Sequence, residues 1–437
     1  MRTESGAEVR LSEKNMKSHY APTLLAILAL LPSARADVVT DWNLTSIQVS
    51  KAQAPFSGAA LNTNLATRIH AIESVAVYNA VNSILQFGTS YGEYDVPAPA
   101  TASVEAAAAK AARDVLANYF PSQTATLDSL YEASIAAIAD GQDKTDGILA
   151  GSEAASHIIA LRANDGSSPN VTYAGPAAPG VGVYQLTPNI PPATVPPFTF
   201  ANGINQQWAA VTPFILSSPG QFRPLPPPAV GTARYVKALN QVKVYGDPAN
   251  PRHTAELQHI AQFYKQDAEI LDNEAARLLS ASHNLSVADN ALFFVTLDTA
   301  IADTRIAEWE AKYFYLYWRP ITALNANGSG AVTNNYAAWK PALVTPNHPS
   351  YPSGHSGTVV AIEVLRAYFG DFNTLTLHTT TAGEPARTVT SLTQIEVDNG
   401  LSRIYGGIHF SFDNEAGQKL GRNVANYVLA NGPQLNP

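Results

Sequence analysis

Three groups of basic and imidazole residues follow one another in the second half of the chain, and their types suit them to chemistry. In chain order they are Lys312 and Arg319, then Ser353, Gly354 and His355, then Arg403 and His409. Three cations match the charge of a tetrahedral oxyanion such as phosphate or vanadate. Two histidines beside such an anion supply acid–base or nucleophilic groups that work near neutral pH.

The first group is expected to present two cations to one target. Lys312 and Arg319 are seven positions apart, close to two helical turns. We therefore predict that both project from one face of a helix, which Pro320 then helps to terminate. Arg403, in the third group, adds a planar guanidinium whose donors match a tetrahedral oxyanion.

The second group is expected at the start of a helix. Ser353, Gly354 and His355 precede an apolar run, 358–369, with helical length and period. A helix start binds anions because its first amides point outward and the positive end of the helix dipole lies there. Gly354 lets an oxyanion approach the backbone closely. His355 and His409 then remain for chemistry, one as a nucleophile or apical metal ligand and the other as an acid or base.

The motifs Lys-x6-Arg-Pro, Pro-Ser-Gly-His and Ser-Arg-x5-His resemble the three signature motifs of the vanadium-dependent haloperoxidases and the related type-2 phosphatidic acid phosphatases. The resemblance implies a vanadate cofactor, for which phosphate can substitute. It implies that His409 ligates vanadium and that His355 is the acid–base residue. It also implies that the vanadate oxygens are bound by Lys312, Arg319, Ser353, Gly354 and Arg403.

Three neighbouring residues extend this prediction. Trp309 falls where the haloperoxidases often carry tryptophan. His348 resembles a position where chloroperoxidases carry phenylalanine and algal bromoperoxidases histidine, so we expect oxidation of bromide and iodide with little or no chloride activity. The alternative role for His348 is that of a loop histidine whose imidazole caps a backbone carbonyl. Asp413 is either the N-cap of the last helix or a carboxylate that orients His409 four residues before it.

The same residues leave other functions open. A phosphatase would use the same site, with His409 attacking phosphorus and His355 protonating the leaving group. A non-catalytic phosphate or vanadate binder is disfavoured, because it has no need of two histidines. Zinc is disfavoured because two prolines separate His348 from His355 and the chain has no cysteine. The haloperoxidase is favoured, and its partners would be hydrogen peroxide, a halide and a small organic acceptor, with a homodimer as a possible assembly.

The periodicity of the chain predicts an all-α fold, a large helical bundle of two packed four-helix-type bundles with long Pro-rich connecting loops. A short hairpin near 376–390 is the only strand signal. Helical periods occur at 65–85, 102–119, 122–139, 144–162, 229–245, 253–263, 269–282, 286–317 and 413–429. Such an architecture says nothing of function by itself.

The chain divides into segments of different composition. They are an N-terminal extension and signal peptide (1–36), an N-terminal helical layer (37–165), a Pro/Gly-rich connecting segment (166–228) and a C-terminal bundle with the oxyanion site (229–437). Lys17, a short apolar stretch and Ala34-Arg35-Ala36 predict export, with cleavage near Ala36 and translation from Met1 or Met16. We expect a secreted or periplasmic protein without stable membrane association. A formal net charge of −8 makes nucleic acid an unsuitable partner.

Overall fold

The computed structural model describes residues 37–52, 63–189 and 199–436. The predicted signal peptide and both candidate start residues lie outside these ranges. No helix in them combines the length and the hydropathy needed to cross a bilayer.

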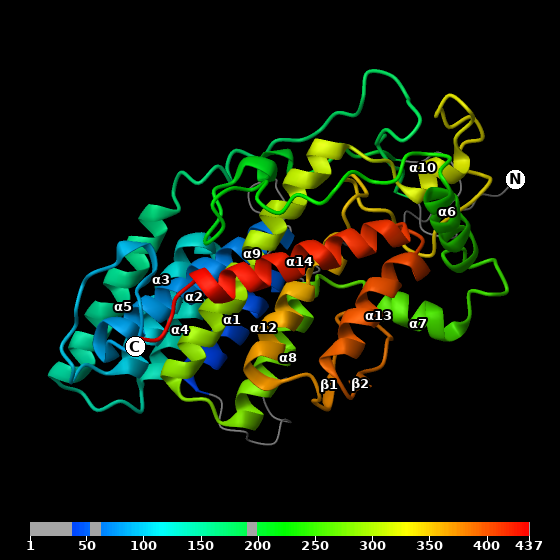
Figure 1. Cartoon of the computed structure of the whole chain (residues 1–437). Coiled ribbons are helices and arrows are strands. Elements are labelled where there is room, and N and C mark those ends of the chain that lie inside the picture. Colours follow the sequence, from blue (N-terminus) through cyan, green and yellow to red (C-terminus); the bar gives the residue numbers. More distant parts are fainter. Residues whose placement is uncertain (1–36, 53–62, 190–198, 437) are drawn as a thin grey trace, which may run out of the picture. The chain divides into compact units, whose positions relative to one another are not determined.

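The described chain is helical apart from one small antiparallel hairpin, which confirms the all-α prediction (Figure 1). The N-terminal elements are α1 (Val38–Ala52), α2 (Thr63–Leu85), η1 (Tyr91–Glu93), α3 (Val104–Tyr119), η2 (Pro121–Gln123), α4 (Thr124–Ile135), α5 (Gln142–Leu161) and η3 (Gln206–Ala210). The later elements are α6 (Ala233–Tyr245), α7 (Ala255–Phe263), α8 (Ala268–His283), α9 (Val287–Tyr315), α10 (Pro320–Asn325), α11 (Gly354–Gly357), α12 (Val359–Phe369), β1 (Leu375–Leu377), β2 (Arg387–Val389), α13 (Leu392–Tyr405) and α14 (Ser411–Asn431).

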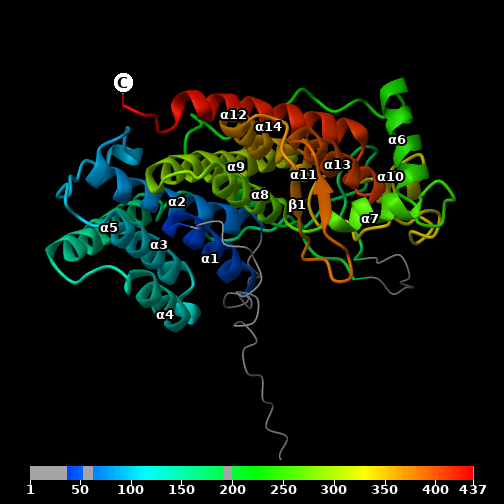
Figure 2. The same cartoon turned by 90° about the horizontal axis from the view of Figure 1, so that it is seen from below.

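Helix α9 is the central element because it is buried along nearly its whole length. It begins with a capping box, in which Ser286 and Asp289 bond each other's backbone amides. Helix α2 packs along one side of α9, and α12 and α14 pack against it as well. Figure 2 shows α2 between α3 and α9. A helix buried all round is rigid, so side chains on its last turns are held in fixed positions.

The N-terminal helices form a layer through unusually close packing. A Cβ added at Gly147 of α5 would lie 2.3 Å from the carbonyl oxygen of Ser103, and one at Gly151 would lie 2.3 Å from that of Ala107. Ala106, Ala107 and Ala111 of α3 lie against these glycines and are buried. Small residues thus let α3 and α5 approach closely, which accounts for the alanine-rich stretch in the sequence.

The described parts of the Pro/Gly-rich segment, 166–189 and 199–228, include a packed loop, as the aromatic residues of the segment predict. Trp208 and Phe214 are buried. On α9, the carboxylate of Asp303 accepts hydrogen bonds from three successive backbone amides of residues 214–216, at 2.5 to 2.8 Å. This contact ties the loop to the central helix. The segment boundaries at 165 and 228 stay predictions.

One detail of the prediction for α9 is wrong. The helix ends at Tyr315, because Leu316 adopts a left-handed conformation (φ 46°, ψ 47°) and its amide bonds the carbonyl of Lys312. Arg319 therefore does not project from the helix that carries Lys312. Pro320 begins α10 at a position that needs no amide hydrogen, and so does not terminate α9. Helices α1 and α13 were not predicted from the sequence.

Candidate active site

The structure brings the three motifs together from five separate elements. Lys312 lies in the last turn of α9 and Arg403 in the last turn of α13. Ser353 is the N-cap of the short α11, where its side chain accepts a hydrogen bond from the Ser356 amide. Arg319 lies between α9 and α10, and His409 lies two residues before the first residue of α14. The amide of Ser353 also donates to the carbonyl of Asp413 at 3.0 Å, which joins α11 to α14.

Three of these residues are buried cations without a carboxylate partner. Lys312 and Arg319 are fully buried and Arg403 is 2% exposed. Within the described ranges, none of the three forms an ion pair with an aspartate or glutamate. Burial lowers the pKa of Lys312, lowers that of Arg319 to about 10 and, together with the charge of Arg319, lowers that of Arg403 to about 9. Such a cluster is stabilised by an anion from outside the chain.

Lys312 and Arg319 use their donors to hold the motif loops in place. The Lys312 ammonium donates to the carbonyls of Pro349, Ser350 and Pro352. The Arg319 guanidinium donates to the carbonyl of His348 at 2.9 Å and to that of Ile408 at 2.8 Å. These two cations thus connect the second and third motifs while adding positive charge.

A cavity of about 300 Å³ lies beside this cluster. Of the predicted residues, its wall contains Trp309, His348, Gly354, His355, Arg403 and His409. Lys312, Arg319 and Ser353 do not line the cavity, and they lie behind its wall. The residues predicted to share an oxyanion therefore form two shells in this structure, one facing the cavity and one supporting it.

Steric crowding explains why the second motif has a glycine at position 354. A Cβ at Gly354 would lie 3.0 Å from Nη1 of Arg305 and 3.3 Å from Oε2 of Glu308. The amide of Gly354 is among the first of its helix, and such amides have no acceptor within the helix. The missing side chain at Gly354 thus makes room for Arg305 and Glu308. The first amides of α11 and the cations without carboxylate partners fit a tetrahedral oxyanion such as vanadate or phosphate.

His409 is oriented by a carboxylate. Its Nδ1 lies 3.0 Å from Oδ2 of Asp413, and the Ser350 hydroxyl donates to that same oxygen at 2.5 Å. Because a carboxylate accepts, the imidazole proton is placed on Nδ1, which leaves a lone pair on Nε2. The Nε2 atom lies 3.0 Å from Nη1 of Arg319. Burial and the charge of Arg319 hold the pKa of His409 well below its usual value.

The sequence left two roles open for Asp413, the N-cap of the last helix and the carboxylate that orients His409. Its contact with His409 fits the second role. Asp413 occupies the third residue of α14, whose N-cap is Phe410, and its carboxylate also accepts from the Phe410 amide at 3.1 Å. Burial raises the pKa of Asp413, while Ser350 and the nearby cations oppose that effect.

His355 faces the cavity with one nitrogen already bonded. Its Nε2 donates to the carbonyl of Gln266 at 3.0 Å, so the proton is on Nε2 and the lone pair on Nδ1. Burial and then Arg403 and Arg305 lower the pKa of His355 well below its usual value. The neutral imidazole is thus the form that this site favours.

His348 lies between a cation and an aromatic ring. Its Nδ1 is 3.1 Å from Nη2 of Arg319 and 3.2 Å from the Pro349 carbonyl oxygen. Its ring centroid is 4.9 Å from that of Trp309. The carbonyl contact expected of a loop histidine is therefore present, but the ring also lines the cavity beside the predicted oxyanion site.

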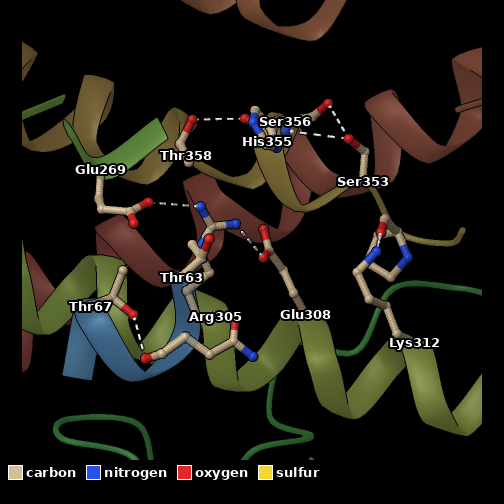
Figure 3. A network of polar contacts seen from close by, with 12 residues as sticks. Thr63, Thr67, Glu269, Arg305, Glu308, Lys312, Ser353, His355, Ser356 and Thr358 are labelled. Carbon is tan, nitrogen blue, oxygen red and sulfur yellow. Dashed lines mark hydrogen bonds and ion pairs between the residues drawn. The ribbon is translucent and has the colours of Figure 1, made fainter. Parts of the chain in front are cut away.

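A buried ionic network that the sequence did not predict lies behind Gly354 (Figure 3). Nη1 of Arg305 lies 3.2 Å from Oε2 of Glu308, and Nη2 lies 3.4 Å from Oε2 of Glu269. Burial raises the pKa of Glu308 to about 7 and that of Glu269 to about 8. Arg305 precedes Lys312 by seven residues on α9, and that spacing was the available signal.

Comparisons with known proteins show which family the chain resembles. Residues 292–435 match the family model described as the VCPO second helical-bundle domain. The vanadium chloroperoxidase of Curvularia inaequalis is 27% identical over 133 residues, which cover 27% of this chain and 19% of that enzyme. The match thus spans about a fifth of the curated relative.

Two solved bacterial structures share the fold. The first bacterial vanadium-dependent iodoperoxidase has a TM-score of 0.69 and 24% identity, covering 90% of this chain and 94% of its own. The holo-type bacterial vanadium-dependent chloroperoxidase has a TM-score of 0.69 and 16% identity, covering 90% and 96%. These findings confirm the resemblance seen in the motifs. The chain has the helical fold of the vanadium-dependent haloperoxidases, and its C-terminal part is similar to their second bundle domain.

Proposed function

We propose that this protein is a vanadium-dependent haloperoxidase that oxidises bromide or iodide with hydrogen peroxide to hypohalous acid. The observation that carries the proposal is the cluster of three buried cations without carboxylate partners beside an oriented histidine. The family match over residues 292–435 supports it. Vanadate, when bound, would supply the centre at which peroxide is activated toward the halide.

The residues of the chain would bind the cofactor, fix the position of the His409 proton and accept a proton from a reactant. Asp413 keeps the His409 proton on Nδ1, so that Nε2 can serve as the ligand to vanadium. Arg403 and the Gly354 amide would bind oxyanion oxygens from the cavity side, and the buried charges of Lys312 and Arg319 would balance the negative charge from behind. The Nδ1 lone pair of His355 can accept a proton from a reactant in the cavity.

Substitution of His409 tests the cofactor assignment. We expect His409→Ala to lose vanadium that the wild type retains through gel filtration, because the imidazole that Asp413 orients is removed. The measurement is vanadium per protein by elemental analysis. His283→Ala is the matched control, since His283 lies on α8 and bonds its own helix carbonyl. Undiminished vanadium in His409→Ala would refute the ligand assignment.

A phosphatase is the second candidate, because phosphate has the shape and similar charge of vanadate. The His409–Asp413 pair has the arrangement of a nucleophile with an orienting acid. Purified protein is to be loaded with vanadate and assayed for triiodide formation, and the protein without vanadate assayed for phosphomonoester hydrolysis. Turnover of the ester without halide oxidation would replace the first proposal with the second.

Halide choice is proposed to depend on His348. A phenyl ring there would exclude water and leave the oxyanion site less screened, whereas the imidazole contacts Arg319 and can exchange protons. Chloride is the hardest of the three halides to oxidise, so we expect His348→Phe to raise the ratio of chloride to bromide oxidation. Steady-state rates with each halide across pH are the measurement. Unchanged rates and pH profiles would mean that His348 has no part in selection.

A further inference from the structure

The short connection between α7 and α8, residues 264–267, supplies two carbonyls to the candidate active site although it lies outside all three motifs. Nε2 of His355 donates to the carbonyl of Gln266 at 3.0 Å, and Nη2 of Arg403 donates to that of Tyr264 at 2.6 Å. His355 and Arg403 both line the cavity. The connection therefore contacts cavity-lining residues of the second and third motifs at the same time.

The side chain of Gln266 joins this connection to the hairpin formed by β1 and β2. It is buried, at 7% exposed. Its Nε2 donates to the carbonyl of His378 at 3.1 Å, and its Oε1 accepts from the Thr380 amide at 2.8 Å. Both ends of the side-chain amide are thus bonded to the loop that follows β1. A polar group whose partners are all present is held in one orientation, and so is the backbone beside it.

The same loop also bonds the end of α7. The hydroxyl of Thr379 donates to the carbonyl of Phe263 at 2.8 Å, and that of Thr381 donates to the carbonyl of Gln262 at 2.9 Å. The last carbonyls of a helix lack the amide partners of its interior, and these hydroxyls supply donors there. Figure 1 shows the hairpin near α8 and α13, which it also contacts. The hairpin therefore holds the connection in place from outside the motifs.

The carbonyl of Gln266 determines which tautomer His355 adopts. A carbonyl only accepts, so its contact with Nε2 places the imidazole proton there and leaves the lone pair on Nδ1. Without this contact the proton would distribute over both nitrogens, and one of the two tautomers has no lone pair at Nδ1. The position of one peptide thus controls whether His355 can accept a proton from the cavity.

We propose that Gln266 is a positioning residue for His355 and that the hairpin acts through its side chain. The hairpin fixes the side chain, and the side chain fixes the peptide whose carbonyl selects the tautomer. This role rests on the proposed function, in which His355 accepts a proton from peroxide. The proton moves from a peroxide oxygen to Nδ1 and the bonding electron pair stays on that oxygen, so the Nδ1 lone pair must be free before each turnover.

Nuclear magnetic resonance of the imidazole nitrogens measures the tautomer without turnover. The full-length protein is labelled with isotopic nitrogen in its histidines, and the His355 signals are assigned by their loss in His355→Gln. We expect the wild type to show a protonated Nε2 and an unprotonated Nδ1 near neutral pH. Gln266→Met keeps a side chain of similar volume but can form neither hydrogen bond. In this variant both nitrogen signals should shift toward the average of the two tautomers.

A second variant and a matched control use the same measurement. Thr379→Val with Thr381→Val removes the two hydroxyl bonds to α7 and should produce a smaller shift in the same direction. Gln123→Met is the control, because Gln123 bonds the carbonyl of Val49 at 3.0 Å in the N-terminal layer. It should leave the His355 nitrogens and the rate of iodide oxidation unchanged. In vanadate-loaded Gln266→Met, kcat for iodide should fall roughly tenfold, part of what a positioned acid–base group contributes.

The outcomes separate the positioning role from the proposed function. Unchanged His355 nitrogens in Gln266→Met would overturn the positioning role, and the double threonine variant decides in the same way if Gln266→Met does not fold. An equal shift in Gln123→Met would overturn it as well. Shifted nitrogens with an unchanged kcat would reject the role in the reaction. A wild type that oxidises no iodide, together with shifted nitrogens in Gln266→Met, would reject the proposed function and keep the positioning of His355.

Discussion

Two groups of buried cations in this protein differ in what neutralises them. Arg68 and Arg162 both contact the carboxylate of Asp165, at 2.7 and 2.8 Å. Although burial raises the pKa of Asp165, the two arginines hold it below its usual value. Lys312, Arg319 and Arg403 are as deeply buried, yet their hydrogen-bond partners among the described residues are only carbonyls, a hydroxyl and imidazoles.

The difference shows that burial of charge does not by itself identify a functional site. A cluster that contains its own carboxylate is complete and serves the fold. A cluster without one is completed by an anion that arrives from outside, which is the condition for binding an oxyanion such as vanadate. The comparison can be tested by removing the counter-charge from one group and supplying it to the other.

The largest effect is expected at Asp165. Its replacement by alanine leaves Arg68 and Arg162 buried and unpaired, so the free energy of unfolding should fall by about 3–5 kcal/mol. Urea denaturation is the measurement. Asp128→Ala is the control, because Asp128 pairs with Arg113 at the surface and should cost at most about 1 kcal/mol. Similar losses in the two variants would remove the basis of the comparison.

The next effect is stabilisation of the wild type by an external anion. Phosphate at a hundred times its dissociation constant should raise the free energy of unfolding by about 2.7 kcal/mol. In Arg403→Leu the phosphate affinity should fall about tenfold to a hundredfold, the loss of a hydrogen bond to a charged group. Calorimetric titration and unfolding with and without phosphate measure both quantities. Full stabilisation of Arg403→Leu by phosphate would show that the anion binds elsewhere.

The smallest effect concerns Glu308, whose folded pKa is raised from 4.5 to about 7 by burial, against the opposing charges of Arg305 and Lys312. A raised carboxyl pKa contributes stability that is fully present below pH 4.5 and lost as the pH rises through about 7. Glu308→Gln removes this titration. Its stability should therefore fall less than that of the wild type between pH 5 and pH 7.5, as melting temperatures at both values would show. Parallel losses would contradict the assignment to Glu308.

The sequence alone determined the motif residues, their order and the all-α class. Helical periodicity and the four-residue separation of His409 and Asp413 are local properties, and local geometry follows from local sequence. The bounds of α9 were less secure, because the left-handed Leu316 that ends it has no strong sequence signal. Helix α13 was not predicted, although Ser391 at its N-cap is an ordinary helix-start signal.

Only the tertiary structure decided which charges are paired and which groups share a cavity. Asp165 reaches Arg68 across 97 positions, and Glu269 reaches Arg305 across 36. Asn64 and Trp309 meet one cavity from helices far apart in the chain. Such contacts depend on how helices pack, which periodicity does not encode. The same packing placed Arg403 in the wall of the cavity and Lys312 and Arg319 behind that wall. The two cations lie there because helix packing brings the carbonyls of the motif loops within hydrogen-bonding distance of them.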